Sequence, residues 1–299
     1  MKKKFRRILC LVMVMSISIM SSVTALADRV DADLDTPYLS LGADLTNEQK
    51  ATVLGLLGLA EADLSQYNVV TVTNEDEHNY LGSYLDASVI GTRALSSVLV
   101  VGKESGYGIQ VKTQNISYCT TGMYRNALIT AGVQDADISV AGPFSISGTA
   151  ALVGAIKAYE VMTGETVSDD SLDVANNELV VTGEVAESVG DSEKAEELIA
   201  LVKQEVVAGN ITNADDIERL IDEAASELEI TLTDEDRDKI AALMEKIKGL
   251  NLDVETIKSQ AQDLYDRLDA LEFDFDLESA SNWFTKIIDS VVDFFRNLF

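Results

Sequence analysis

The sequence of 299 residues has one histidine, two cysteines and few basic residues. A Ser-His-Asp or Cys-His catalytic site would have to use His78, and a metal site built from several histidines is excluded. Cys10 lies in an apolar N-terminal stretch that we expect to be removed, which leaves Cys119 alone and excludes an intramolecular disulfide. A lone thiol can be a nucleophile, but we favour a small buried residue next to a helix start.

Basic residues are outnumbered, with 23 Lys and Arg against 51 Asp and Glu and a net charge of −28. Such a charge disfavours binding to DNA, RNA and other polyanions. Asp31, Asp33 and Asp35 begin like a calcium loop, but the required glycine and glutamate are replaced by Thr36 and Gly42. We therefore predict no nucleic-acid partner, no metal site and no cofactor.

Residues 1–27 have the order of a Sec-type signal peptide. Basic residues come first, an apolar stretch follows from Ile8 to about Met20, and a small-residue site ends at Ala27. The alternative is a membrane anchor, but the apolar stretch is shorter than the roughly 20 residues that cross a bilayer. We expect cleavage near Ala27, a mature chain that begins near Asp28, and a secreted or envelope-associated protein.

The mature chain divides by pattern into segments of different character. We predict an acidic mobile segment at 28–37, an α/β domain at 38–180, a linker at 181–191 and a helical bundle at 192–271. An acidic alternating segment and an amphipathic helix would follow at 272–299. The expected fold class is α+β or α/β, with a mixed-sheet N-terminal domain followed by an amphipathic helical bundle.

Within the first domain the pattern predicts helix, strand, helix, hairpin, helix, strand and helix, in that order. Strands at 95–101 and 107–113 flank a glycine-containing loop, which indicates a β-hairpin. Thr46 with Gln49, and Asn74 with Glu77, have the spacing of capping boxes. Residues 169–190 are polar, with a short strand as one option at 179–181, and we place the domain boundary there.

Four stretches of the sequence resemble the YpuA-like family, which consists of exported proteins mostly from Gram-positive bacteria, catalogued as a domain of unknown function. They are residues 41–46, 74–78, 121–132 and 147–152, and the resemblance covers roughly residues 38 to 270. It implies an envelope or extracellular role. It transfers no catalytic residue, because the family has no established activity.

One candidate catalytic group is His78, which follows the acidic run Glu75-Asp76-Glu77. The functional interpretation is an acid–base pair with the histidine poised near neutral pH. The structural interpretation, which we favour, places the three carboxylates in the first turn of a helix, where they stabilise the helix dipole. His78 would then pack on the face of Leu81 and Leu85.

A second candidate is the loop that links a predicted strand to the helix at 148–162. Backbone N–H groups at such a helix start can bind an anion. The loop lacks the lysine of a Walker A motif and the spacing of a nucleophile elbow, so an ordinary N-cap is the competing interpretation. The candidate ligand-binding residues are Ser147, Gly148, Thr149, Thr121 and Arg125.

The C-terminal residues 272–299 contain two amphipathic patterns. Residues 272–278 alternate acidic and apolar side chains, which suits either cation binding or a solvated strand or linker. At the helical period, residues 282–299 separate into a polar half and an apolar half wider than that of a typical surface helix. The apolar half includes Trp283, Phe284, Ile287, Ile288, Val291, Phe294, Phe295 and Leu298.

Something must cover that apolar half. We expect docking within the protein or onto a second copy, with a membrane interface or an envelope protein partner as the alternatives. The leading functional hypothesis is a non-enzymatic exported binding or interaction protein that contacts partners through its helical region. The alternative is an envelope hydrolase that uses His78 with a nearby hydroxyl or carboxylate.

Overall fold

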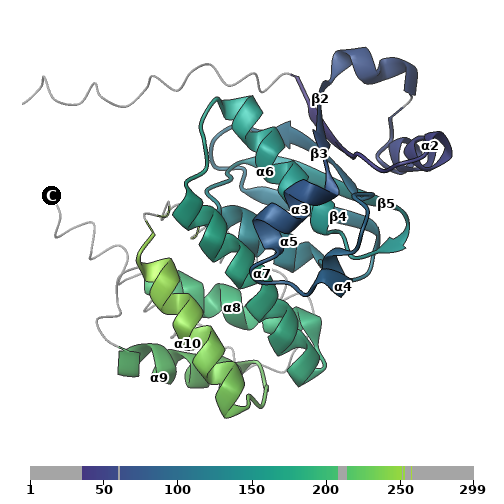
Figure 1. The fold of residues 1–299 in the computed structure, drawn as a ribbon. Helices are drawn as coiled ribbons and strands as arrows, with labels where there is room; N and C mark the ends of the chain where they lie inside the picture. Colours follow the sequence, from purple (N-terminus) through teal and green to yellow (C-terminus); the bar gives the residue numbers. More distant parts are fainter. Residues whose placement is uncertain (1–35, 60, 208–213, 251, 253–256, 258–299) are drawn as a thin grey trace, which may run out of the picture.

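The computed structural model describes residues 36–59, 61–207, 214–250, 252 and 257. In this part a five-stranded mixed sheet with covering helices is followed by further helices (Figure 1). The predicted α+β class with a mixed sheet is therefore confirmed. The predicted leader, nearly all of the acidic segment, the last part of the predicted bundle and the C-terminal segment lie outside the described residues. No described helix is long and apolar enough to cross a bilayer.

The strands are β1 (Tyr38–Gly42), β2 (Asn68–Val72), β3 (Ser97–Gly102), β4 (Ile109–Ile116) and β5 (Ala136–Ile146). The helices of the sheet region are α2 (Asn47–Leu56), α3 (Asn74–Leu81), α4 (Ala87–Ile90), α5 (Thr121–Thr130) and α6 (Thr149–Thr163), with a 3-10 turn η1 (Glu61–Gln66). The helices that follow are α7 (Asp169–Val189), α8 (Ser192–Val207), α9 (Ala214–Glu227) and α10 (Asp234–Lys248).

The predicted β-hairpin is wrong, because β5 lies between its two strands. The sheet order is β2-β1-β3-β5-β4, with β5 antiparallel to β3 and parallel to β4. Asp135, which precedes β5, holds the loop between β3 and β4 in place. Its carboxylate accepts hydrogen bonds from the backbone N–H groups of Gly106 and Gly108, at 3.0 and 2.9 Å.

Both predicted helix starts have a capping box, the first at the predicted residues and the second shifted by one residue. Thr46 caps α2 with a complete capping box, as predicted. The cap of α3 is Thr73 with Asp76, one residue before the predicted pair. This shift points Glu77 away from the capping interaction and into the protein. The first turn of α8 is likewise capped by Asp191, whose carboxylate accepts a hydrogen bond from Lys194 N at 3.1 Å.

Helix α7 replaces the predicted linker at 181–191 and the optional strand at 179–181. Ser168 caps its start and Gly190, in the left-handed conformation, ends it. Its buried residues include the polar side chains of Asn176, Glu178 and Thr182 as well as apolar ones. Because α7 contributes Leu179 to the core under the sheet and Val185 to the core of the helical region, it connects the two.

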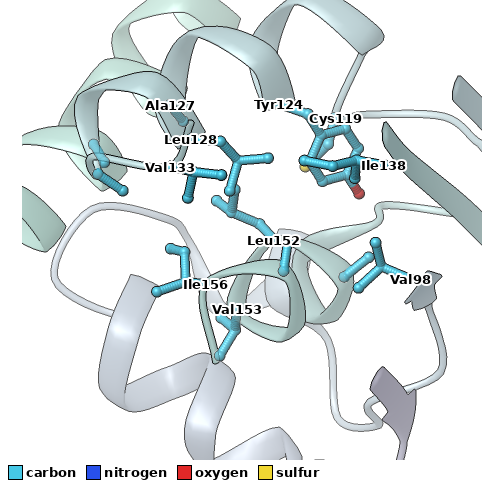
Figure 2. Close-up of a cluster of buried hydrophobic side chains, with 14 of the residues drawn as sticks. Val98, Cys119, Tyr124, Ala127, Leu128, Val133, Ile138, Leu152, Val153 and Ile156 are labelled. Atoms are coloured by element: carbon cyan, nitrogen blue, oxygen red, sulfur yellow. The ribbon is translucent and has the colours of Figure 1, made fainter. Parts of the chain in front are cut away.

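The main core lies between the sheet and helices α5, α6 and α7. Figure 2 shows part of it, where side chains from β3 and β5 meet those of α5 and α6. A smaller cluster on the opposite side of the sheet packs α2 against Leu39, Leu41 and Ala141. Buried apolar residues of α8, α9 and α10 form a third cluster.

A buried ionic network joins helices α5, α7 and α8. Lys203 Nζ lies 2.8 Å from Glu178 Oε1, and both side chains are fully buried. The ammonium also donates to the carbonyl oxygen of Asn126 at 3.0 Å and to Thr130 Oγ1 at 3.3 Å. Burial lowers the pKa of Lys203 although Glu178 opposes the shift. The network therefore fixes how the helical region sits on the sheet region, at a cost in desolvation.

We predict that Lys203→Met lowers the free energy of unfolding by about 3–5 kcal/mol, because it leaves the Glu178 carboxylate buried without its cation. The double variant Lys203→Met with Glu178→Leu should recover most of that loss. Arg219→Met is the matched control, because Arg219 pairs with Glu223 on the surface. Urea unfolding at pH 7 checks this, and equal effects of Lys203→Met and Arg219→Met would contradict it.

Candidate functional site

Three of the predicted site residues, His78, Ser147 and Thr149, lie at the contact between α3 and the start of α6. We call this region the α3–α6 junction and define it by Asn74, Glu77, His78, Gly91 and Thr149. Helix α3 supplies the first three residues, the turn after α4 supplies Gly91, and Thr149 is the first residue of α6.

Glu77 is the buried acid of the junction, with 1% of its surface exposed. Its Oε1 accepts a hydrogen bond from Thr149 Oγ1 at 2.7 Å, and its Oε2 accepts one from Asn74 Nδ2 at 3.3 Å. Burial raises the pKa of Glu77, and these two hydrogen bonds oppose the increase. The junction thus holds a carboxyl group that is harder to ionise than a surface glutamate.

A backbone N–H group at the start of α6 donates its hydrogen bond to a residue from elsewhere in the fold. Its N-cap is Gly148, which has no side chain to offer, and the backbone N–H of Ala151 donates to Ser96 Oγ at 2.9 Å. Gly148 itself has a φ of +98°, and a Cβ there would lie 2.5 Å from the Tyr124 hydroxyl. Only glycine fits this turn, so the sequence of the loop is set by packing at this position.

His78 lies on the surface of the junction rather than in the core with Leu81. Its Nε2 lies 3.2 Å from the carbonyl oxygen of Gly91, which requires the proton on Nε2. In the part of the chain that the structure describes, the hydrogen-bond partner of the ring is thus a backbone carbonyl and not a hydroxyl or carboxylate. The predicted packing of His78 on the helix face is wrong, because Glu77 occupies the inward position.

Cys119 is buried beside α5, as the structural interpretation predicted. Figure 2 shows its sulfur next to the ring of Tyr124, within the hydrophobic cluster. Burial raises the pKa of the thiol to about 12. A thiol with this pKa is protonated at neutral pH, so it is a poor nucleophile.

The predicted ligand-binding residues are divided between two places. Ser147 Oγ lies 3.3 Å from Thr149 Oγ1, so these two hydroxyls share the junction. Thr121 is exposed at the start of α5. Arg125 is buried and lies close enough to Lys203 to lower its pKa, so it belongs with the ionic network between helices.

An ion pair joins α3 and α6 on the solvent-exposed side of their contact. Lys157 Nζ lies 2.6 Å from Asp76 Oδ1 and 5.9 Å from the centroid of the Tyr80 ring. Asn176 of α7 donates from Nδ2 to the carbonyl oxygen of Tyr80 at 2.6 Å. Helices α6 and α7 therefore both hold α3 against the sheet region.

Sequence reasoning missed two residues of this region, Glu77 as a buried acid and Ser96 as the acceptor for an amide in the first turn of α6. The capping box of Thr73 and Asp76 gave the signal for Glu77, because it fixes which residues of α3 point inward. Ser96 lies 55 positions before the amide that it accepts from, so no local pattern indicates that role. Among the described residues, no group of three or more His, Cys, Asp or Glu side chains could hold a metal ion.

The candidate contact residues between Trp283 and Leu298 lie outside the described residues, so the structure does not place them.

The fold and the junction define an α+β protein with a mixed sheet and an attached set of helices. The chain belongs to the family described as protein of unknown function DUF1002, whose model matches residues 41–264. It is 40% identical over 263 residues to the uncharacterized protein YpuA of Bacillus subtilis (strain 168), which covers 88% of each chain. No solved structure matches the chain.

We predict that Glu77→Gln changes the pH dependence of stability. The pKa of Glu77 is raised in the folded state, so the folded chain holds this proton more tightly than the unfolded chain. The resulting contribution to stability is fully present below the unfolded pKa, which is near 4.5, and is lost as the pH rises through the folded pKa. Glutamine carries no titrating proton and should remove this loss.

The measurement is urea unfolding from pH 4 to pH 8 for the wild type, Glu77→Gln and the control Glu75→Gln. Glu75 lies in the same helical turn but is exposed, so its variant should follow the wild-type curve. Parallel curves for all three proteins would show that burial of Glu77 does not affect its ionisation.

Proposed function

We propose that the protein is exported and acts by binding, at the cell envelope or outside the cell, rather than as an enzyme. The observation that carries this proposal is that the side chains best suited to catalysis are already hydrogen-bonded or buried within the fold. His78 donates to a backbone carbonyl, the Cys119 thiol is buried with a pKa of about 12, and Glu77 is occupied by two hydrogen bonds. Each of these groups is buried or already hydrogen-bonded within the fold.

An envelope hydrolase is the competing function, and the junction provides the test of it. Such an enzyme would need an acid or hydroxyl that reaches the substrate. Glu77 and Thr149 are each 1% exposed, and their mutual hydrogen bond of 2.7 Å takes the hydroxyl proton of Thr149. His78 is accessible, but its Nε2 proton is directed to Gly91. This geometry favours binding over hydrolysis.

The proposed partner is an envelope protein or a second copy of the chain, contacted through the helical region and residues 282–299. The leader-like residues 1–27 support export. The apolar half of residues 282–299 supports a contact role, because large apolar side chains left in water cost about 1.5–3 kcal/mol each. A membrane interface is the alternative partner for the same half.

For export, we predict that the protein recovered outside the cytoplasm begins at or near Asp28, because Ala25-Leu26-Ala27 provides the small residues that signal peptidase requires. N-terminal sequencing of the mature protein measures this directly. A mature protein that still carries Met1 would contradict cleavage.

For binding, we predict that full-length protein and His78→Ala capture the same crosslinked partner, or the same homo-oligomer, in intact cells. A variant truncated after Ser281 should lose that product if the C-terminal apolar half makes the contact. Liposome flotation of the same three proteins tests the membrane alternative.

The protein functions as an enzyme instead if His78→Ala abolishes its function in the native host while the unfolding transition and the crosslinked products stay unchanged.

A further inference from the structure

The two edge strands of the mixed sheet, β2 and β4, differ in charge and length. An edge strand offers backbone N–H and C=O groups that can pair with another extended segment. Strand β2 is uncharged along Asn68–Val72 and exposes Val69. Strand β4 is longer and carries an exposed lysine, Lys112, near its middle.

Lys112 is the charged residue of β4 and lies on the outer face of the strand. Gln110, Lys112 and Gln114 are the exposed residues of this face. Lys103 Nζ pairs with Asp137 Oδ2 at 2.7 Å, and Lys112 also lowers the pKa of Asp137 by its charge. The outer face of β4 thus carries a lysine in a protein whose net charge is −28.

The inner face of β4 is apolar. Ile109 is buried, and Val111 and Ile116 are half-buried against the main core. A strand added next to β4 would therefore need apolar side chains on this face, to extend the core, and acidic side chains on the other, to meet Lys112.

Residues 272–278 have this combination in their sequence. Their side chains alternate strictly, with acids at one set of positions and apolar residues at the other. The last described residue, Ile257, is buried in the main core. From there the chain to Glu272 can extend up to about 50 Å, more than twice the roughly 20 Å width of a five-stranded sheet. The acids are Glu272, Asp274, Asp276 and Glu278, and the apolar residues are Phe273, Phe275 and Leu277.

A second copy of the chain is a poorer occupant of the same edge. Two β4 strands paired antiparallel about their centres would bring the two Lys112 side chains close together, and like charges opposite each other destabilise a sheet. The irregular register at Gln114 and Ile116 would also interrupt a longer pairing between copies.

We propose that residues 272–278 pair with the free edge of β4 and form a sixth strand of the sheet. The apolar residues extend the main core at its margin, and the acids face Lys112. This contact brings the C-terminal part of the chain back to the sheet region. A partner that uses the β4 edge must displace the segment.

The test is hydrogen–deuterium exchange on the full mature chain, read at residues 110–114. Phe275→Pro removes a backbone donor from the proposed strand, and we expect exchange at these residues to rise roughly tenfold or more. Phe284→Pro is the matched control, because it alters the C-terminal region outside the proposed strand. The amides of β2 serve as an internal reference and should not change.

A second pair of variants tests the charge. Lys112→Glu should also raise exchange at residues 110–114, whereas Lys112→Arg should not. The proposal is overturned if Phe275→Pro leaves exchange at β4 unchanged. It is also overturned if the protection of β4 disappears on dilution, which would assign the edge to a second copy.

Discussion

The close contact of α6 with the sheet is the constraint on which the other interfaces depend. Gly154 faces β1 so closely that a Cβ would lie 2.4 Å from Ser40 Oγ. This contact sets the height of α6 above the sheet, and the residues from Thr149 to Ile156 are all buried there. With α6 fixed, its start lies at Glu77 and its exposed side presents Lys157 to Asp76. Helix α3 is thereby held at both ends of the contact.

Three of the scarce basic residues join segments that are distant in sequence. Lys157 links α6 to α3, Lys203 links α8 to α5 and α7, and Lys103 links the loop after β3 to β5. A cation in such a position offsets part of the repulsion that a strongly acidic chain meets on folding. The buried pair of Lys203 and Glu178 also restricts how the helices pack, because any other arrangement would leave a charge buried and unpaired.

Local signals predicted local features and failed where the answer depends on distant segments. The capping box of Thr46 and Gln49 follows from spacing alone. The hairpin failed because the insertion of β5 is a property of the whole sheet. Strand β1 is buried along its whole length, so it lacks the alternation that indicates a half-exposed strand. In the candidate site, the sequence indicated Thr149 as a candidate ligand-binding residue. It indicated Glu77 as a capping residue and not as a buried acid.

The junction also explains why a strand–loop–helix connection of this kind need not bind an external anion. The positive end of a helix attracts negative charge, and here Glu77 of the same chain lies beside the first residue of α6. Ser96 accepts from an amide that an anion would otherwise use. An incoming anion would have to displace both groups and would also meet the overall negative charge of the molecule. Recognition is therefore physically easier at surfaces with little negative charge, such as the β2 edge of the sheet.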